Sequence, residues 1–269
     1  MNEPPLGPSQ PPSPTPADAP PPPSPAPDAS GKLPKTSRNV GLPTIGWTPL
    51  TVIFGVLTAI GITLFGTFPV AIFDPELDST AANDISQLMV AVGLFGGALI
   101  FALTDAGGRL GEALRSLGFR GIAIRIVGLA ILAWLAYVAL AALAAPLLQP
   151  DQEDITREIG GDDGSVLALV IAGLLIVVAA PISEEVFFRG FMFAGLRNSM
   201  PIWPAAVISA IVWGSLHIPG GNIGVAVQLA IFGVVLAWLY ERSGTLWAPV
   251  LAHGINNTIA FVLLATDSI

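Results

Sequence analysis

Long apolar runs follow one another through most of this chain and restrict the folds open to it. A helix needs about 20 residues to cross the apolar core of a bilayer, and a single buried helix of a soluble protein would not explain a whole series of such runs. The sequence predicts an all-α, polytopic transmembrane helix bundle of about seven spans. The candidate spans are Trp47–Phe73, Ile85–Leu103, Ile122–Leu148, Leu167–Phe193, Trp203–His217, Val225–Tyr240 and Leu246–Leu264.

The composition agrees with a chain embedded in a membrane. Only 11% of the 269 residues are charged, whereas a typical soluble domain has about 25%. The formal net charge is -8 and no basic patch is present, which argues against nucleic acid as a partner. The chain has no cysteine, so disulfides, thiolate metal ligands and cysteine nucleophiles are excluded.

The segment before the first apolar run, residues 1–42, has a different composition. It is rich in Pro, Ser, Ala and Asp and includes a run of prolines at 20–23. Such a segment buries too little apolar surface to offset the entropy lost on ordering, so we expect a disordered, Pro-rich cytoplasmic tail. A solvated tether is the simplest interpretation of this tail, and a ligand for Pro-binding modules is the alternative.

Basic residues are unequally distributed among the segments that connect the apolar runs. The segments at 74–84 and 151–163 are acidic, with Arg157 as the single basic residue. Because cytoplasmic segments carry the excess of Lys and Arg, we expect a multi-pass protein of the plasma membrane with its N-terminus in the cytoplasm and its C-terminus outside. The residues that indicate this orientation are Lys32, Lys35, Arg38, Arg109, Arg115, Arg120, Arg125, Arg197 and Arg242.

A few polar residues lie within the last four predicted spans. Ionisable groups inside a membrane are costly and usually mark function. With a rise of about 1.5 Å per residue, four of these residues lie roughly 16 to 22 Å from the cytoplasmic ends of their helices. They come from three helices and reach one level near the middle of the bilayer, so they can surround a single cavity. These four residues are Glu184, His217, His253 and Asn257.

Helical spacing separates the two neighbouring glutamates of the fourth predicted span. Glu185 and Arg189 are four residues apart, which lets them pair on one face of the helix. Glu184 is rotated by about 100° from Glu185 and lacks that partner. We therefore interpret Glu185 and Arg189 as structural, supporting residues and Glu184 as the free carboxylate.

These residue types allow more than one kind of site. A carboxylate and an imidazole can activate water for attack on a peptide carbonyl, while a second imidazole and an amide stabilise the oxyanion. Alternatively, Glu184, His217 and His253 could bind zinc with an open position for water. A proton-coupled transporter, or polar residues that only hold helices together, are further alternatives.

Three ordered motifs in the last four predicted spans resemble the CPBP family, which comprises CAAX prenyl endopeptidases, bacteriocin-processing proteins and abortive-infection proteins. The family pattern is Glu-Glu-x-x-x-Arg, then Phe-x-x-x-His, then His-x-x-x-Asn. The first motif matches at Glu184, Glu185 and Arg189, and the third at His253 and Asn257. The second matches at His217, with Trp213 where Phe is usual. We expect this exchange of aromatic residues to affect packing more than chemistry.

The resemblance implies a membrane-embedded peptide hydrolase of the CAAX-protease type. It implies that Glu184 and His217 activate water, that His253 and Asn257 form the oxyanion hole, and that Trp213 supports the site. Members of the family have been described both as metalloproteases and as metal-independent glutamate proteases. We favour a reaction that requires no cofactor, because Asn is a poor zinc ligand and a good oxyanion donor; zinc is the alternative.

The expected substrate is a membrane-associated peptide or protein, reached from the lipid bilayer. The alternative is a non-catalytic membrane immunity or binding protein with the same fold. We expect the chain to divide into the tail at 1–42, transmembrane spans one to three at 43–164, and the catalytic transmembrane core at 165–269.

Overall fold

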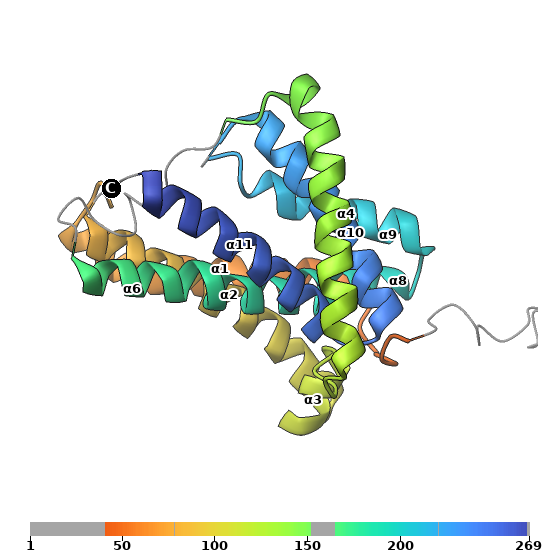
Figure 1. Ribbon diagram of the computed structural model, residues 1–269. Coiled ribbons are helices and arrows are strands. Elements are labelled where there is room, and N and C mark those ends of the chain that lie inside the picture. The colour runs from red at the N-terminus through yellow and green to blue at the C-terminus, as the bar shows by residue number, and fades with distance from the viewer. Residues whose placement is uncertain (1–40, 78, 152–164, 220, 268–269) are drawn as a thin grey trace, which may run out of the picture. The chain divides into compact units, whose positions relative to one another are not determined.

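The structure is a computed structural model that describes residues 41–77, 79–151, 165–219 and 221–267 (Figure 1). The predicted disordered tail lies outside the described residues except for its last two positions. Leu42, at its end, is buried in the core, so the packed part of the chain begins at or before this residue. Most of the acidic segment at 151–163 also lies outside the described residues.

The described residues form helices and no strand. From Val166 to Arg197 the helical segments follow each other without interruption, and two of them are π-helices, labelled η2 and η3. The elements are α1 (Pro49–Phe73), α2 (Thr80–Asp105), α3 (Leu110–Ser116), α4 (Ile124–Leu148), α6 (Val166–Leu174), η2 (Leu175–Ala179), α7 (Ala180–Glu184), η3 (Glu185–Phe193), α8 (Ala194–Arg197), α9 (Ile202–Ser215), α10 (Ile223–Ser243) and α11 (Trp247–Asp267).

All of the predicted apolar runs coincide with helices, and the all-helical class is confirmed. Within the described residues, 5 helices are long and apolar enough to cross a membrane: α1, α2, α4, the continuous helix Val166–Arg197, and α10. Helix α9 is a shorter apolar helix of 14 residues. The count of about seven spans therefore stays a prediction. The short helix α3 was not predicted.

Local sequence signals set several helix ends. Helix α1 starts with Pro49 in its first turn, where the missing N–H costs nothing, after a capping box made by Thr48 and Thr51. The Ser79 hydroxyl caps α2 by accepting from the Ala82 N–H. Helix α10 ends at Gly244, whose φ of 68° is the left-handed conformation that favours glycine at this position.

The Gly-x-x-x-Gly pair of α2 brings α2 against α1, and the two helices lie side by side in Figure 1. A Cβ atom on Gly93 would lie 2.7 Å from the backbone oxygen of Ala59, and one on Gly97 would lie 2.9 Å from the Ala59 Cβ. Small residues allow this close approach of two backbones. The glycine pair therefore serves packing within the chain.

The remaining helices enclose η3 and α8, the C-terminal part of the continuous helix Val166–Arg197. Helix α10 packs against α9 and α4, and α11 packs against α4 and η2. Every residue of η3 is buried. At one end of the bundle, Arg197 binds Glu241 of α10 through two hydrogen bonds of 3.0 and 2.8 Å. The Tyr240 hydroxyl donates to the Leu117 carbonyl at 3.2 Å. These contacts hold η3, α9, α10 and α11 together around the predicted site residues.

Candidate active site

The two adjacent glutamates sit where α7 passes into η3. Glu184 is the last residue of α7 and Glu185 the first of η3. The Glu185 side chain is fully buried, whereas the Glu184 side chain is 14% exposed. Single π-helical turns inside α-helices are frequent at functional sites. The structure therefore gives the two carboxylates different environments, as the sequence predicted from their angular separation.

Glu185 binds both a cation and an imidazole through the same oxygen. Its Oε1 accepts from Nη1 of Arg189 at 2.7 Å, which is the pair expected from the spacing, and lies 2.8 Å from Nδ1 of His253. A carboxylate can only accept, so we assign the proton of the imidazole to Nδ1. The second ring nitrogen, Nε2, then faces Glu184 Oε2 at 4.0 Å. Sequence reasoning treated Glu185 as the partner of Arg189 alone and did not predict that it orients His253.

Arg189 is 1% exposed and has two further contacts. Its Nη2 donates to the Gly233 carbonyl at 3.3 Å, and its guanidinium carbon lies 4.6 Å from the centroid of the Trp213 ring. Among the described residues, Nε of Arg189 and Oε2 of Glu185 are buried without a hydrogen-bond partner. The ion pair is therefore enclosed by protein, which makes either charge costly to leave alone.

Trp213 contacts more of the site than its place in the motif indicated. Its indole Nε1 donates to Glu184 Oε2 at 2.5 Å. Its ring stands edge to face against His217 and His253, with centroids 5.2 and 5.3 Å away. The exchange of Phe for Trp adds an indole N–H, which Phe lacks, and this N–H binds the carboxylate itself. The expectation that the exchange affects packing more than chemistry stays a prediction.

His217 lies two residues beyond the end of α9 and is half-buried. Its Nδ1 lies 3.1 Å from the Trp213 carbonyl oxygen. Because a carbonyl can only accept, this contact assigns the proton to Nδ1 and leaves Nε2 as a free acceptor. Trp213 thus contacts both His217 and Glu184.

Asn257 lies one turn after His253 on α11, and its side-chain amide is directed at the neighbouring helix. Its Nδ2 donates to the Ile176 carbonyl of η2 at 2.9 Å. An asparagine amide has two N–H donors, so one is committed to helix packing and the second is available. Of the predicted set, Glu184 and His253 face each other directly, His217 joins them through Trp213, and Asn257 is held partly by η2.

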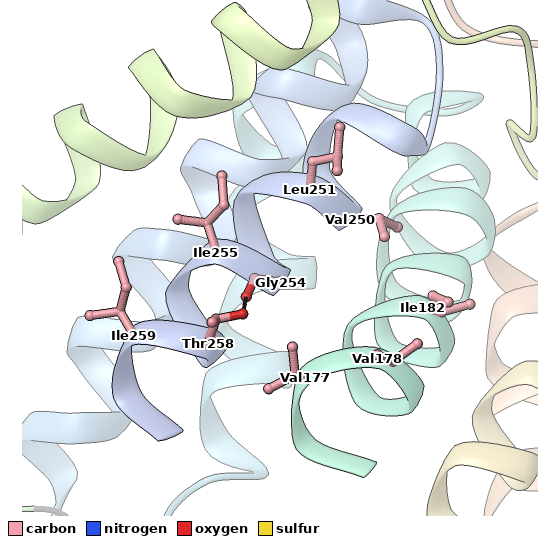
Figure 2. Close-up of a pocket in the computed structure, with 9 residues that line it drawn as sticks. All are labelled: Val177, Val178, Ile182, Val250, Leu251, Gly254, Ile255, Thr258 and Ile259. Atoms are coloured by element: carbon pink, nitrogen blue, oxygen red, sulfur yellow. Dashed lines mark hydrogen bonds between the residues drawn. The ribbon is translucent and has the colours of Figure 1, made fainter. Parts of the chain in front are cut away.

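An apolar cavity of about 370 Å³ lies between η2, α7 and α11 (Figure 2), and α7 and α11 also carry Glu184 and His253. Ile182 lies two residues before Glu184, and Gly254 directly follows His253. The one polar side chain of the lining, Thr258, donates to the Gly254 carbonyl at 2.6 Å. The lining consists of Val177, Val178, Ile182, Val250, Leu251, Gly254, Ile255, Thr258 and Ile259.

The residues of the site do not form a preformed cage for a metal ion. Within the described parts of the chain, no three side chains of the His, Cys, Asp or Glu type lie close enough together to hold one. Glu184 Oε2 already accepts from the indole, and Nδ1 of His253 is bound to Glu185. Zinc bound by Glu184, His217 and His253 stays an alternative, and no step below depends on a metal.

Comparison with known proteins gives matches to the C-terminal part of the chain. Residues 166–259 match the family model described as type II CAAX prenyl endopeptidase Rce1-like. A Bacillus subtilis (strain 168) protein named as a membrane peptidase, YdiL, is 29% identical over 93 residues, which is 34% of this chain and 37% of that protein. An uncharacterised 24.3 kDa protein of Escherichia coli is 28% identical over 102 residues, 37% of this chain and 47% of that protein.

CAAX prenyl protease 2 of Homo sapiens is 31% identical over 101 residues, which is 31% of this chain and 31% of that protein. The chain thus matches less than half the length of each of these relatives. No solved structure matches it. The matched segment contains all three motifs, from the glutamate pair to Asn257. The resemblance indicated by the motifs is confirmed: residues 166–259 of this chain are similar to the type II CAAX prenyl endopeptidase Rce1-like family.

Proposed function

We propose that the protein is an intramembrane endopeptidase that hydrolyses peptide bonds of a membrane-associated peptide or protein. The observation that carries this proposal is the direct approach of Glu184 and His253, which are far apart in sequence but whose Oε2 and Nε2 atoms lie 4.0 Å apart inside an apolar helix bundle. The family match over residues 166–259 supports the same activity. The proposal includes a plasma-membrane bundle of about seven spans with a cytoplasmic N-terminus, an external C-terminus and a catalytic core at 165–269.

The reaction begins with a water molecule next to Glu184 and His217. Glu184 takes a proton from this water, and the water oxygen attacks the carbonyl carbon of the scissile bond. Nε2 of His217, left free by the contact of Nδ1 with Trp213, accepts the second hydrogen of the water and orients it. When the tetrahedral intermediate collapses, the C–N bond breaks and the proton on Glu184 passes to the leaving amine.

His253 and Asn257 stabilise the oxyanion in this scheme. Nδ1 of His253 faces the Glu185 carboxylate, so Nε2 can donate to the oxyanion only as an imidazolium, which Glu185 stabilises. Asn257 donates its second amide N–H, since the first is bound to the Ile176 carbonyl. Together these donors supply the stabilisation that acyl transfer needs.

The apolar cavity between η2, α7 and α11 supports a substrate that is embedded in or attached to the membrane. It holds about 370 Å³ and is lined almost entirely by aliphatic side chains (Figure 2). Several neighbouring apolar residues are exposed, among them Leu174 at 58% and Val178 at 46%. In a membrane protein such a surface faces lipid. An apolar substrate segment could therefore reach the cavity from the bilayer.

The decisive experiment compares the wild type with Glu184→Gln in liposomes. Peptides released from a membrane fraction would be identified by mass spectrometry, and the cleavage rate of one identified peptide then measured. We expect at least about a hundred-fold loss of turnover, because a general base contributes about 10²–10⁴-fold. Glu112→Gln is the matched control, since Glu112 is 51% exposed and forms an exposed pair with Arg109 at 2.7 Å.

The alternative, a non-catalytic immunity or binding protein, makes the opposite prediction. There, Glu184→Gln would retain full biological protection and no peptide would depend on Glu184. Unchanged cleavage in a correctly folded Glu184→Gln variant would eliminate the proposed mechanism.

A further inference from the structure

Trp213 is enclosed at the centre of the candidate site. It is 1% exposed and is among the largest fully buried side chains. His217, His253 and Phe232 surround its ring, with centroids between 5.2 and 6.2 Å away. The Arg189 guanidinium lies over the ring at 4.6 Å. These contacts enclose the indole ring of Trp213.

The indole N–H of Trp213 points at the Glu184 carboxylate. The indole nitrogen can only donate and an ionised carboxylate can only accept, so the hydrogen bond between Nε1 and Oε2 has one assignment. Among the described residues, this is the single hydrogen bond that the Glu184 side chain makes. Its Oε1 has no protein partner there and remains available to a water molecule.

A charged acceptor in an apolar surrounding makes such a bond strong. Hydrogen bonds to ionised groups contribute about 1.5–3 kcal/mol, and low local polarity strengthens them. A buried indole N–H also needs a partner of its own. Phenylalanine at this position would fill much of the same space, but it would offer Glu184 no donor.

We propose that Trp213 is a positioning residue that fixes the Glu184 carboxylate through its indole N–H, so that Oε1 faces the attacking water. This inference rests on the proposed function. It assigns to Trp213 a polar role that its aromatic motif position does not require. Trp213 is not among the residues that line the apolar cavity, so an exchange of Trp213 leaves that lining unchanged.

The first test is Trp213→Phe, which removes the donor and retains an aromatic ring. We expect kcat to fall about ten- to hundred-fold, the equivalent of the lost hydrogen bond to a charged group. KM should change little, since substrate contacts are retained. Trp134→Phe is the matched control: Nε1 of Trp134 is buried without a partner among the described residues, so its loss should leave both constants unchanged.

The second test does not depend on catalysis or on the folding of Trp213→Phe. The indole ¹⁵N–¹H signals of the wild-type protein in nanodiscs are assigned with Trp→Phe variants of the other tryptophans among the 6, so that the Trp213 signal is identified by elimination. Glu184→Gln should shift the Trp213 signal strongly, whereas Glu112→Gln should not. A Trp213 signal that does not respond to Glu184→Gln would overturn the inference.

The two tests also separate this inference from the proposed function. If the wild type cleaves no peptide but the Trp213 signal responds to Glu184→Gln, the protease proposal fails and the hydrogen bond stands without a catalytic role. If the wild type is active and a folded Trp213→Phe keeps its kcat, the protease proposal stands and the positioning role of Trp213 is refuted.

Discussion

Replacing Arg189 by Met tests whether the buried ion pair holds the site together. Arg189 and Glu185 are 1% and 0% exposed, and their charged atoms are 2.7 Å apart. After Arg189→Met, the Glu185 carboxylate would remain buried with Nδ1 of His253 as its single described partner. Removing one member of a buried pair typically destabilises a protein by about 3–5 kcal/mol, because an uncompensated charge stays inside.

The matched comparison is Arg109→Met. Arg109 forms an equally short pair with Glu112 at 2.7 Å, but the two side chains are 67% and 51% exposed. Solvent screens such a pair, so we expect a loss of about 0–1 kcal/mol. The assay is reversible unfolding in mixed detergent micelles, followed by the fluorescence of the 6 tryptophans.

A second variant tests the physical reason. Glu185→Gln combined with Arg189→Met removes both charges and keeps an oxygen acceptor for His253. We expect the double variant to be clearly more stable than Arg189→Met alone. If Arg189→Met were no more destabilising than Arg109→Met, or if the double variant were the least stable of all, the reasoning from burial would be wrong.

Three further predictions concern packing, the oxyanion and metal dependence. Gly190→Ala should lower the melting temperature, because a Cβ atom there would lie 2.5 Å from the backbone oxygen of Leu117. Such overpacking costs about 1–3 kcal/mol. Gly173→Ala is the control and should be neutral, because its new Cβ atom would come no closer than 3.5 Å to a neighbour. In the peptide-release assay, Asn257→Ala should reduce kcat by about 10²-fold or more. A lower melting temperature with unchanged kcat would instead show that Asn257 serves helix packing through its hydrogen bond to the Ile176 carbonyl. Treatment with a strong chelator should leave turnover intact, and full loss restored by zinc would contradict a metal-independent reaction.

Local features of the fold could be predicted from the sequence because they depend on neighbouring residues. The apolar runs gave helices at the expected places, since a chain in lipid must satisfy its backbone hydrogen bonds within each segment. The pair of Glu185 and Arg189 followed from one helical turn. The two π-helical segments and α3 were missed, because the apolar pattern does not distinguish a π-helix from an α-helix.

Contacts between distant residues were beyond sequence reasoning. Glu185 and His253 are 68 positions apart, Glu184 and Trp213 are 29 apart, and Asn257 and Ile176 are 81 apart. Depth along each helix indicated that the site residues lie at one level, but it could not give the rotation of each helix about its axis. That rotation decides which carboxylate oxygen faces which ring nitrogen.

The sequence alone therefore predicted a helical membrane protein, the resemblance of its C-terminal region to CAAX prenyl endopeptidases and the set of polar residues within its apolar runs. The tertiary structure decided how those residues divide their hydrogen bonds. In the structure, Glu185 forms hydrogen bonds with Arg189 and His253, and Glu184 accepts a hydrogen bond from Trp213. The physical reason is that residue types and helical spacing are properties of a segment, whereas the partner of a buried polar atom depends on how several helices pack together.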